Sequence, residues 1–211
     1  MLKPILFTIP LCVAIPMISH ATVGGGQYIE FLGYEPTDKK VYLLRHYEDG
    51  RGRLPQLYYY QFYKANQSPK LFKVNSLYIN QRTRKIDYDQ SIDVLRPELN
   101  KIKQRLQPLQ LITPKIFNIH ILKKQQTNVP AIWIDKTLKV PQYTYQYKVS
   151  SIWFNSQLQQ AVSYKPSLSV KQAYYIPAQN QVLVTVRYLA FPEETGYTTE
   201  DPISLTVKSK I

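Results

Sequence analysis

Two histidines and two adjacent glutamates are the side chains best suited to proton transfer or metal binding. His46 and His120 are far apart in the sequence and belong to no H-E-x-x-H or H-x-H arrangement, whereas catalytic zinc usually has three protein ligands. Each is expected to be a strand histidine with a satisfied hydrogen bond. Glu193 and Glu194 could act as an acid–base pair, but charges at a loop tip are the simpler interpretation. The sequence nominates no catalytic residue, no metal ligand and no cofactor, and enzymatic activity stays an open question.

Residues 87–98 resemble the twelve-residue calcium loop of an EF-hand. Oxygen-bearing side chains occupy positions one, three, five, seven and twelve of this segment: Asp87, Asp89, Ser91, Asp93 and Glu98. The resemblance is incomplete, because isoleucine replaces the glycine of the sharp turn, proline stands at position eleven, and no helical pattern precedes the segment. The alternative, which we prefer, is that the acidic side chains cap a following helix and complement its dipole.

The first 21 residues have the features of a secretory signal peptide. Lys3 provides a positive n-region, residues 6–18 form an apolar stretch, and Ser19-His20-Ala21 is a small-x-small cleavage site. A membrane anchor is the weaker alternative, because the stretch is short and contains two prolines. We therefore expect residues 1–21 to be removed, with no transmembrane segment remaining, and the protein to be periplasmic or secreted.

The only cysteine, Cys12, lies inside this signal. The remaining chain has no thiol, which excludes cysteine nucleophiles, cysteine-ligated zinc and iron–sulfur clusters. There is also no G-x-S-x-G nucleophile elbow and no phosphate-binding P-loop. Stability must come from a hydrophobic core.

Charge is distributed unevenly along the 211 residues. The whole chain has 27 Lys+Arg and 14 Asp+Glu, a net of +13, and residues 64–124 alone hold 13 basic and 4 acidic residues, a net of +9. Six of these cations flank or lie on the expected helix and form the predicted partner-binding surface: Arg82, Arg84, Lys85, Lys101, Lys103 and Arg105.

A basic surface of this kind attracts an acidic protein or an anionic envelope component such as a lipid head group. Nucleic acid is disfavoured as a partner, because an exported protein rarely meets it and the chain lacks RRM, KH and helix-turn-helix signatures. The alternative is a solvated basic surface that only keeps the protein soluble.

Alternation with a period of two predicts most of the secondary structure. In the clearest strand, Tyr143, Tyr145, Tyr147 and Val149 share one face. Two hairpins are predicted: residues 41–47 with 54–63 around Asp49-Gly50, and residues 170–176 with 182–189. Weaker strand candidates are residues 27–34, 70–79, 131–139, 151–154 and 203–207.

The 18 tyrosines allow two interpretations. Rows such as Tyr58-Tyr59-Tyr60 could form core and cross-strand contacts, or one sheet face could be an exposed aromatic platform for a glycan or a protein. We prefer the core interpretation.

One segment breaks the β pattern. Leucine and isoleucine recur at steps of four and three, which predicts an amphipathic helix over residues 94–107. Ser91 or Asp93 should cap it, Pro97 is tolerable in its first turn, and Pro108 should end it.

These patterns predict a mainly β protein, either a β-sandwich or an open antiparallel sheet of tyrosine-rich hairpins, with one helix. Residues 22–211 are expected to form one domain, and any boundary between two lobes would fall near 123–130. The leading hypothesis is an exported, non-enzymatic binding module whose basic surface engages an acidic protein or an anionic envelope component. The alternatives are an envelope enzyme acting on glycan or peptide through carboxylates, and a structural assembly protein of the cell envelope.

Overall fold

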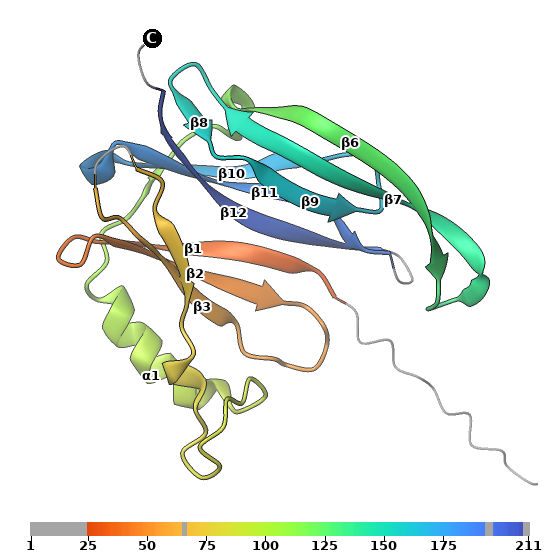
Figure 1. The fold of residues 1–211 in the computed structure, drawn as a ribbon. Helices are drawn as coiled ribbons and strands as arrows, with labels where there is room; N and C mark the ends of the chain where they lie inside the picture. The colour runs from red at the N-terminus through yellow and green to blue at the C-terminus, as the bar shows by residue number, and fades with distance from the viewer. Residues whose placement is uncertain (1–24, 65–66, 193–195, 209–211) are drawn as a thin grey trace, which may run out of the picture.

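The computed structural model describes residues 25–64, 67–192 and 196–208, which form two antiparallel sheets and one α-helix (Figure 1). This confirms the predicted mainly β fold. The expected signal peptide and the Glu193-Glu194 pair lie outside the described residues. No helix within the described ranges is long and apolar enough to cross a membrane.

The smaller sheet has four strands in the order β1-β2-β3-β4: β1 (Gln27–Glu35), β2 (Lys40–Tyr47), β3 (Gln56–Gln61) and β4 (Lys70–Lys73). The larger sheet has eight strands, with β5-β10-β11-β12-β8-β7-β6 in order and β9 paired to β7. Its strands are β5 (Gln110–Leu111), β6 (Asn118–Ala131), β7 (Asp135–Ser150), β8 (Phe154–Ser156), β9 (Gln159–Ser163), β10 (Ser169–Ile176), β11 (Gln181–Phe191) and β12 (Tyr197–Val207). The helix α1 spans Ile92–Lys103, and short 3-10 turns occur at η1 (Ser76–Tyr78), η2 (Pro114–Ile116) and η3 (Pro177–Gln179).

The strands β10, β11 and β12 form the middle layer of the molecule. On one face, Val182, Val184 and Val186 of β11 pack against inward-facing tyrosines of β7, because the larger sheet folds back over itself. On the other face, Leu183 packs against the four-stranded sheet. All six residues from 181 to 186 are buried, as expected for a strand covered on both faces.

Polar side chains join the two sheets along the free edge of β1. Gln172 Nε2 donates to the Ile29 carbonyl at 2.9 Å, and the Ile29 N–H donates to Glu200 Oε2 at 3.4 Å. Arg45 donates to Asp201 Oδ1 at 3.0 Å. Gln172 and Glu200 satisfy the backbone groups of Ile29 that an edge strand would otherwise leave unpaired, so β1 is not an open edge at this residue.

Both predicted hairpins are confirmed. In β2–β3, Tyr42 lies opposite Tyr59, and β10 pairs with β11 through η3. Three weaker strand predictions were wrong in part. Of residues 151–154, only Phe154 belongs to a strand, β8, and the residues before it connect β7 to β8. The expected strand over 70–79 ends at Lys73, because the chain turns inward and Tyr78 receives a 2.7 Å hydrogen bond from the Leu57 N–H. Residues 132–134 within 131–139 form the turn that connects β6 and β7.

The predicted helix is confirmed, with shifted ends. It begins at Ile92 with Ser91 as its N-cap and ends four residues earlier than predicted, because Gln107 leaves it to pair with Tyr34 of β1. Pro97 is the sixth helical residue and not in the first turn. Because proline has no N–H, the Asp93 carbonyl lacks its usual i+4 donor. Asp93 and Pro97 are both exposed, so water can hydrate this carbonyl.

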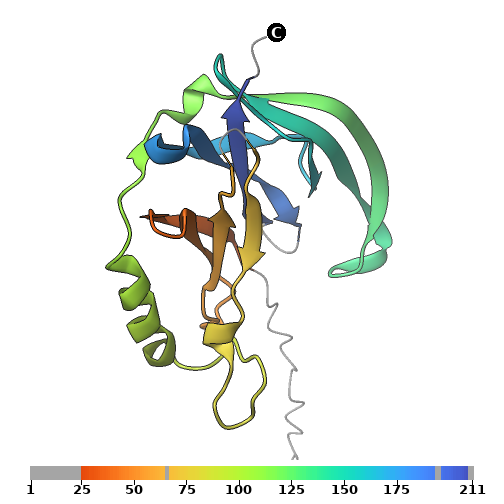
Figure 2. The same cartoon turned by 60° about the vertical axis from the view of Figure 1, so that its left-hand side comes forward.

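The helix covers the outer face of the four-stranded sheet. Leu95 and Leu99 are buried there against Leu57 and Tyr78. This places α1 on the far side of the small sheet from the middle layer (Figures 1 and 2).

The strands β6 and β7 form a hairpin that extends beyond the rest of the larger sheet (Figure 2). The partner β9 accompanies β7 only over residues 143–147, so between this stretch and the hairpin turn β6 and β7 pair only with each other. We call residues 126–140 the arm. The expected boundary region, 123–130, lies inside β6.

Candidate functional site

Arg82, Arg84 and Lys85 stand on a tight turn between η1 and α1, residues 80–86, which we call the basic turn. Asn80 organises it: its Oδ1 accepts hydrogen bonds from the backbone N–H groups of Arg82 at 3.0 Å and Thr83 at 3.2 Å. The Asn80 N–H donates to the Lys85 carbonyl at 2.9 Å, and its carbonyl accepts from the Arg84 N–H at 2.8 Å. An asparagine at this point favours a turn because its side chain bonds its own neighbouring backbone. The three cations are therefore displayed on a defined loop.

All three side chains of the basic turn are exposed. Within the described residues none of them forms an ion pair. The adjacent carboxylate of Asp87 is occupied by N–H donors, from Asn80 Nδ2 at 3.1 Å and the Asp89 backbone at 3.0 Å. The cations therefore present their charge to solvent.

The cations on and after the end of α1 are more constrained. Lys101 Nζ lies 2.7 Å from Glu98 Oε1, and Lys103 Nζ lies 3.8 Å from Glu30 Oε1 of β1. Arg105 is exposed and takes part in no ion pair within the described ranges. One of these three cations is thus available to a partner without breaking an internal pair.

The six predicted residues consequently form two groups at the two ends of α1. The helix between them has 12 residues and is about 18 Å long. Two ion pairs lie along the helix between them, Arg96–Asp93 at 2.9 Å and Lys101–Glu98. The candidate surface is therefore a row of alternating charge with unpaired cations at each end.

The preferred capping role of segment 87–98 is confirmed only in part, because the cap is Ser91 and only Asp93 of the acidic side chains lies in the first turn of α1. Ser91 Oγ accepts a hydrogen bond from the Asp93 N–H at 3.2 Å, which makes Ser91 the N-cap of α1. Asp93 lies in the first turn, where a negative charge complements the helix dipole. In the part of the chain that the structure describes, no three His, Cys, Asp or Glu side chains are placed to hold a metal ion.

Both histidines have the predicted hydrogen bonds. His46 Nε2 lies 2.8 Å from Glu30 Oε2, and its ring stacks on Tyr28 with centroids 4.5 Å apart. His120 Nε2 lies 2.8 Å from Ser150 Oγ. These contacts account for both side chains within strands.

The tyrosine rows are mainly internal, which confirms the core interpretation for the clearest strand. Tyr145 and Tyr147 are buried, and Tyr60 is buried while donating to the Pro202 carbonyl at 2.8 Å. Burial, reinforced by the Asp201 carboxylate, raises the pKa of Tyr147 and of Tyr60 above the ordinary range.

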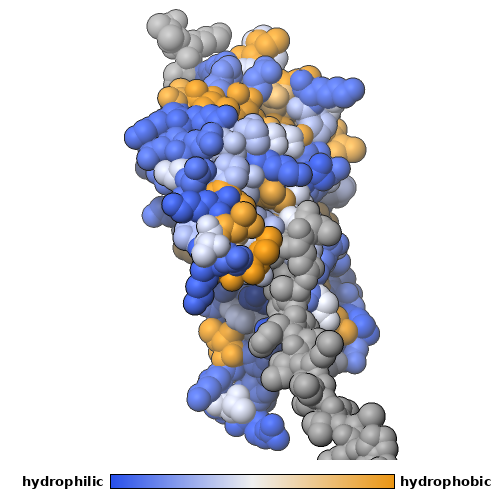
Figure 3. Space-filling model, turned by 90° about the vertical axis from the view of Figure 1, so that its right-hand side faces the viewer, coloured by the Kyte–Doolittle hydropathy of each residue, from blue (hydrophilic) through white to orange (hydrophobic). Residues whose placement is uncertain are grey.

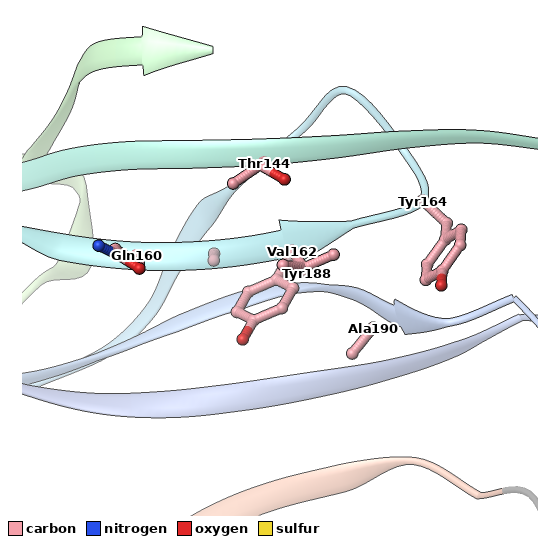
Figure 4. Close-up of a pocket in the computed structure, with 7 residues that line it drawn as sticks. Thr144, Gln160, Val162, Tyr164, Tyr188 and Ala190 are labelled. Carbon is pink, nitrogen blue, oxygen red and sulfur yellow. The ribbon is translucent and has the colours of Figure 1, made fainter. Parts of the chain in front are cut away.

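A hollow of about 360 Å³ lies between β9 and β11 (Figure 4). Its lining comes from β7, β9, β11 and the segment after β9: Thr144, Gln160, Ala161, Val162, Tyr164, Tyr188 and Ala190. The Tyr188 hydroxyl donates to Asp201 Oδ2 at 2.5 Å, and burial raises the pKa of Tyr188. The described lining offers hydroxyls and an amide but no carboxylate, imidazole or amine for acid–base chemistry.

Sequence reasoning missed the tip of the arm. Ile132 and Ile134 are 72% and 68% exposed, and Leu138 is 46% exposed. Figure 3, which faces the side toward which the arm points in Figure 1, shows hydrophobic side chains gathered among hydrophilic ones. The run Ile132-Trp133-Ile134 was a visible signal, but a short apolar run predicts a buried strand equally well.

No family model matches the chain, and searches of curated proteins and of solved structures return no significant match. The functional argument therefore rests on the fold and on these surfaces.

Proposed function

We propose that the protein is an exported, non-enzymatic binding module that holds an acidic protein partner through the basic turn and the C-terminal end of α1. One observation carries the proposal: Arg82, Arg84 and Lys85 are exposed on a turn fixed by Asn80 and have no ion pair within the described residues. Because the backbone of the turn is already ordered, only the side chains lose freedom when a partner binds, so more of the interaction free energy contributes to binding.

The spacing of the charges favours a protein partner over a uniformly anionic surface. The unpaired cations belong to segments before and after α1, which is about 18 Å long, and the ion pairs along the helix include exposed acidic side chains. A uniformly negative surface would gain nothing from this middle region, because each ion pair has no net charge. An acidic protein can place its carboxylates opposite the two cationic ends and avoid the middle.

Charge reversal of the basic turn tests the proposal. The variant R82E/R84E/K85E should lose the retention of an acidic polypeptide from envelope extract, or weaken it roughly tenfold or more, because opposite charges become like charges. Binding of the unmodified protein should also fall between about 0.05 M and about 0.5 M salt, where screening shortens the range of the charges. The bound polypeptides are identified by mass spectrometry.

The matched control is K165E/K171E/K208E, which makes the same change in net charge at exposed lysines of the larger sheet and its C-terminal end. It should retain the polypeptide. Equal retention by both triple variants would contradict the proposal, and so would capture of lipid without any acidic polypeptide.

A further inference from the structure

The arm is a two-stranded segment that extends away from the core, and it has apolar side chains at its tip. Before residue 143, on the side of the tip, β7 has no strand partner except β6. The turn at 132–134 lies at the end of this two-stranded segment (Figures 1 and 2). Of the apolar residues in this turn, Trp133 packs on Tyr164, whereas Ile132 and Ile134 are exposed.

The tip has a defined side-chain arrangement. Trp133 turns toward the body and packs edge-on against Tyr164, with ring centroids 6.3 Å apart. Its neighbours Ile132 and Ile134 are 72% and 68% exposed, and Leu138 joins them at 46%. Single exposed aliphatic residues are ordinary. Three within seven positions at a protruding tip form an apolar surface whose removal from water is favourable in free energy.

The charges around the tip are almost all positive. The hairpin from 118 to 150 has five lysines and one acidic residue, Asp135. The Asp135 carboxylate accepts hydrogen bonds from the Thr137 N–H at 2.8 Å and its hydroxyl at 2.9 Å, and these bonds lower its pKa. Lys136 and Lys139 are exposed and form no ion pair among the described residues.

We propose that the tip of the arm docks on an anionic phospholipid bilayer, with Ile132, Ile134 and Leu138 at the acyl boundary and Lys136 and Lys139 at the head groups. Aliphatic residues beside lysines are the combination that interfacial membrane binding uses, because burial of apolar area and attraction to anionic lipid act together. This inference goes beyond the acidic protein partner and does not depend on it.

Strand addition at the exposed edge of β6 is the less favoured occupant. A bulge interrupts the register between Ile121 and Lys123, two adjacent lysines follow it, and Pro130 lies near the end of the strand. Bulges, lysines and prolines are the features that keep an edge strand from pairing with another chain. They leave the apolar tip itself unprotected.

Vesicle co-sedimentation of the exported protein tests the docking. With vesicles of phosphatidylcholine containing about one third phosphatidylglycerol, I132S/I134S should bind at least about tenfold more weakly than the unmodified protein. K136Q/K139Q should lose roughly fivefold for each lysine, and vesicles of phosphatidylcholine alone should bind poorly. All variants are prepared with the same N-terminal residue, so a difference in vesicle binding comes from the substituted side chains of the arm.

The matched control is L111S/I152S, because these two residues are 70% and 79% exposed but lie away from the arm. It should bind as the unmodified protein does. Equal loss in this control and in I132S/I134S, or no loss in either, would overturn the proposal. Circular dichroism shows whether each variant keeps its fold.

The two tryptophans, Trp133 and Trp153, provide a second readout. In W153F, brominated acyl chains should partly quench Trp133, because it lies between Ile132 and Ile134 in the chain although its ring packs on Tyr164. In W133F they should leave Trp153 emission unchanged. Quenching of Trp153 alone would show that a different face meets the bilayer. In Figures 1 and 2 the arm and α1 point to opposite sides, so R82E/R84E/K85E should still bind vesicles. The two proposals can thus fail separately.

Discussion

Arg84 adopts a backbone conformation that side chains disfavour. Its φ is 57°, in the left-handed region, where glycine or asparagine is the usual choice. The turn needs this conformation, since the Arg84 N–H reaches back to the Asn80 carbonyl. An arginine at a strained and exposed position without an ion pair adds little to the stability of the fold, and its charge is available to the proposed partner.

Replacing Arg84 by glycine separates these two roles. R84G should raise the free energy of unfolding by about 0.5–1 kcal/mol, because glycine adopts the left-handed conformation without strain. The same variant should weaken binding of the acidic partner. Urea denaturation measures the first effect and the pull-down measures the second.

Substitution of Lys85 provides the control. It removes one cation from the same turn, and Lys85 is not among the residues with positive φ. K85G should lose stability through added backbone entropy of the unfolded chain. If R84G is destabilised as much as K85G, strain at Arg84 is not a property of the folded turn.

At the scale of elements, α1 depends on its N-terminal cap. Ser91 both accepts from the Asp93 N–H and donates to Asp93 Oδ2 at 3.1 Å. The helix positions Lys101 and the basic turn relative to each other, and Pro97 weakens it from within. The cap therefore contributes to the geometry of the proposed binding surface as well as to stability.

Removing the cap should have a measurable cost. S91A is expected to lower the free energy of unfolding by about 1 kcal/mol, because the N-terminal N–H group loses its acceptor. S91N should restore most of this loss, since asparagine caps as well as serine. Chemical denaturation followed by circular dichroism checks both, and an unchanged S91A would mean that solvent replaces the cap without cost.

For the whole molecule, buried tyrosines determine the response to alkaline pH. Burial raises the pKa of Tyr78 to about 12 from an ordinary value of 10.0, and it also raises that of Tyr60, Tyr147 and Tyr188. The folded state thus holds protons that the unfolded state releases near pH 10. Stability is fully present below that pH and is lost as pH rises through the folded pKa.

The free energy of unfolding should therefore stay flat to about pH 10 and then fall by about 1.4 kcal/mol per pH unit for each affected tyrosine. Urea titrations at pH of about 9, 10 and 11 measure the slope. Y78F should reduce the slope, while lowering stability at neutral pH because the Leu57 N–H loses its acceptor. A stability that is constant to about pH 11 would contradict this account.

Local patterns in the sequence predicted much of the secondary structure. The alternation from Tyr143 to Val149, the hairpin around Asp49-Gly50 and the leucine spacing of α1 each reflect contacts within one element or between chain neighbours. Such patterns are visible without coordinates because side-chain periodicity follows directly from backbone geometry. The predicted strand over 131–139 was wrong in part, since a short apolar run is the same in a strand and in an exposed turn.

The sequence by itself determined the mainly β class, the single helix and the basic middle third of the chain. Only the tertiary structure decided that the six cations lie in two groups, because helix length and ion pairing with Glu30 and Glu98 set their positions. It also decided that Tyr147 is buried and that Ile132 is exposed. The physical reason is that the burial of a side chain depends on which strand lies opposite it and on where that strand ends. The strand β9, for example, ends before the arm. Such pairings are contacts between residues far apart in the chain, and local sequence patterns do not contain them.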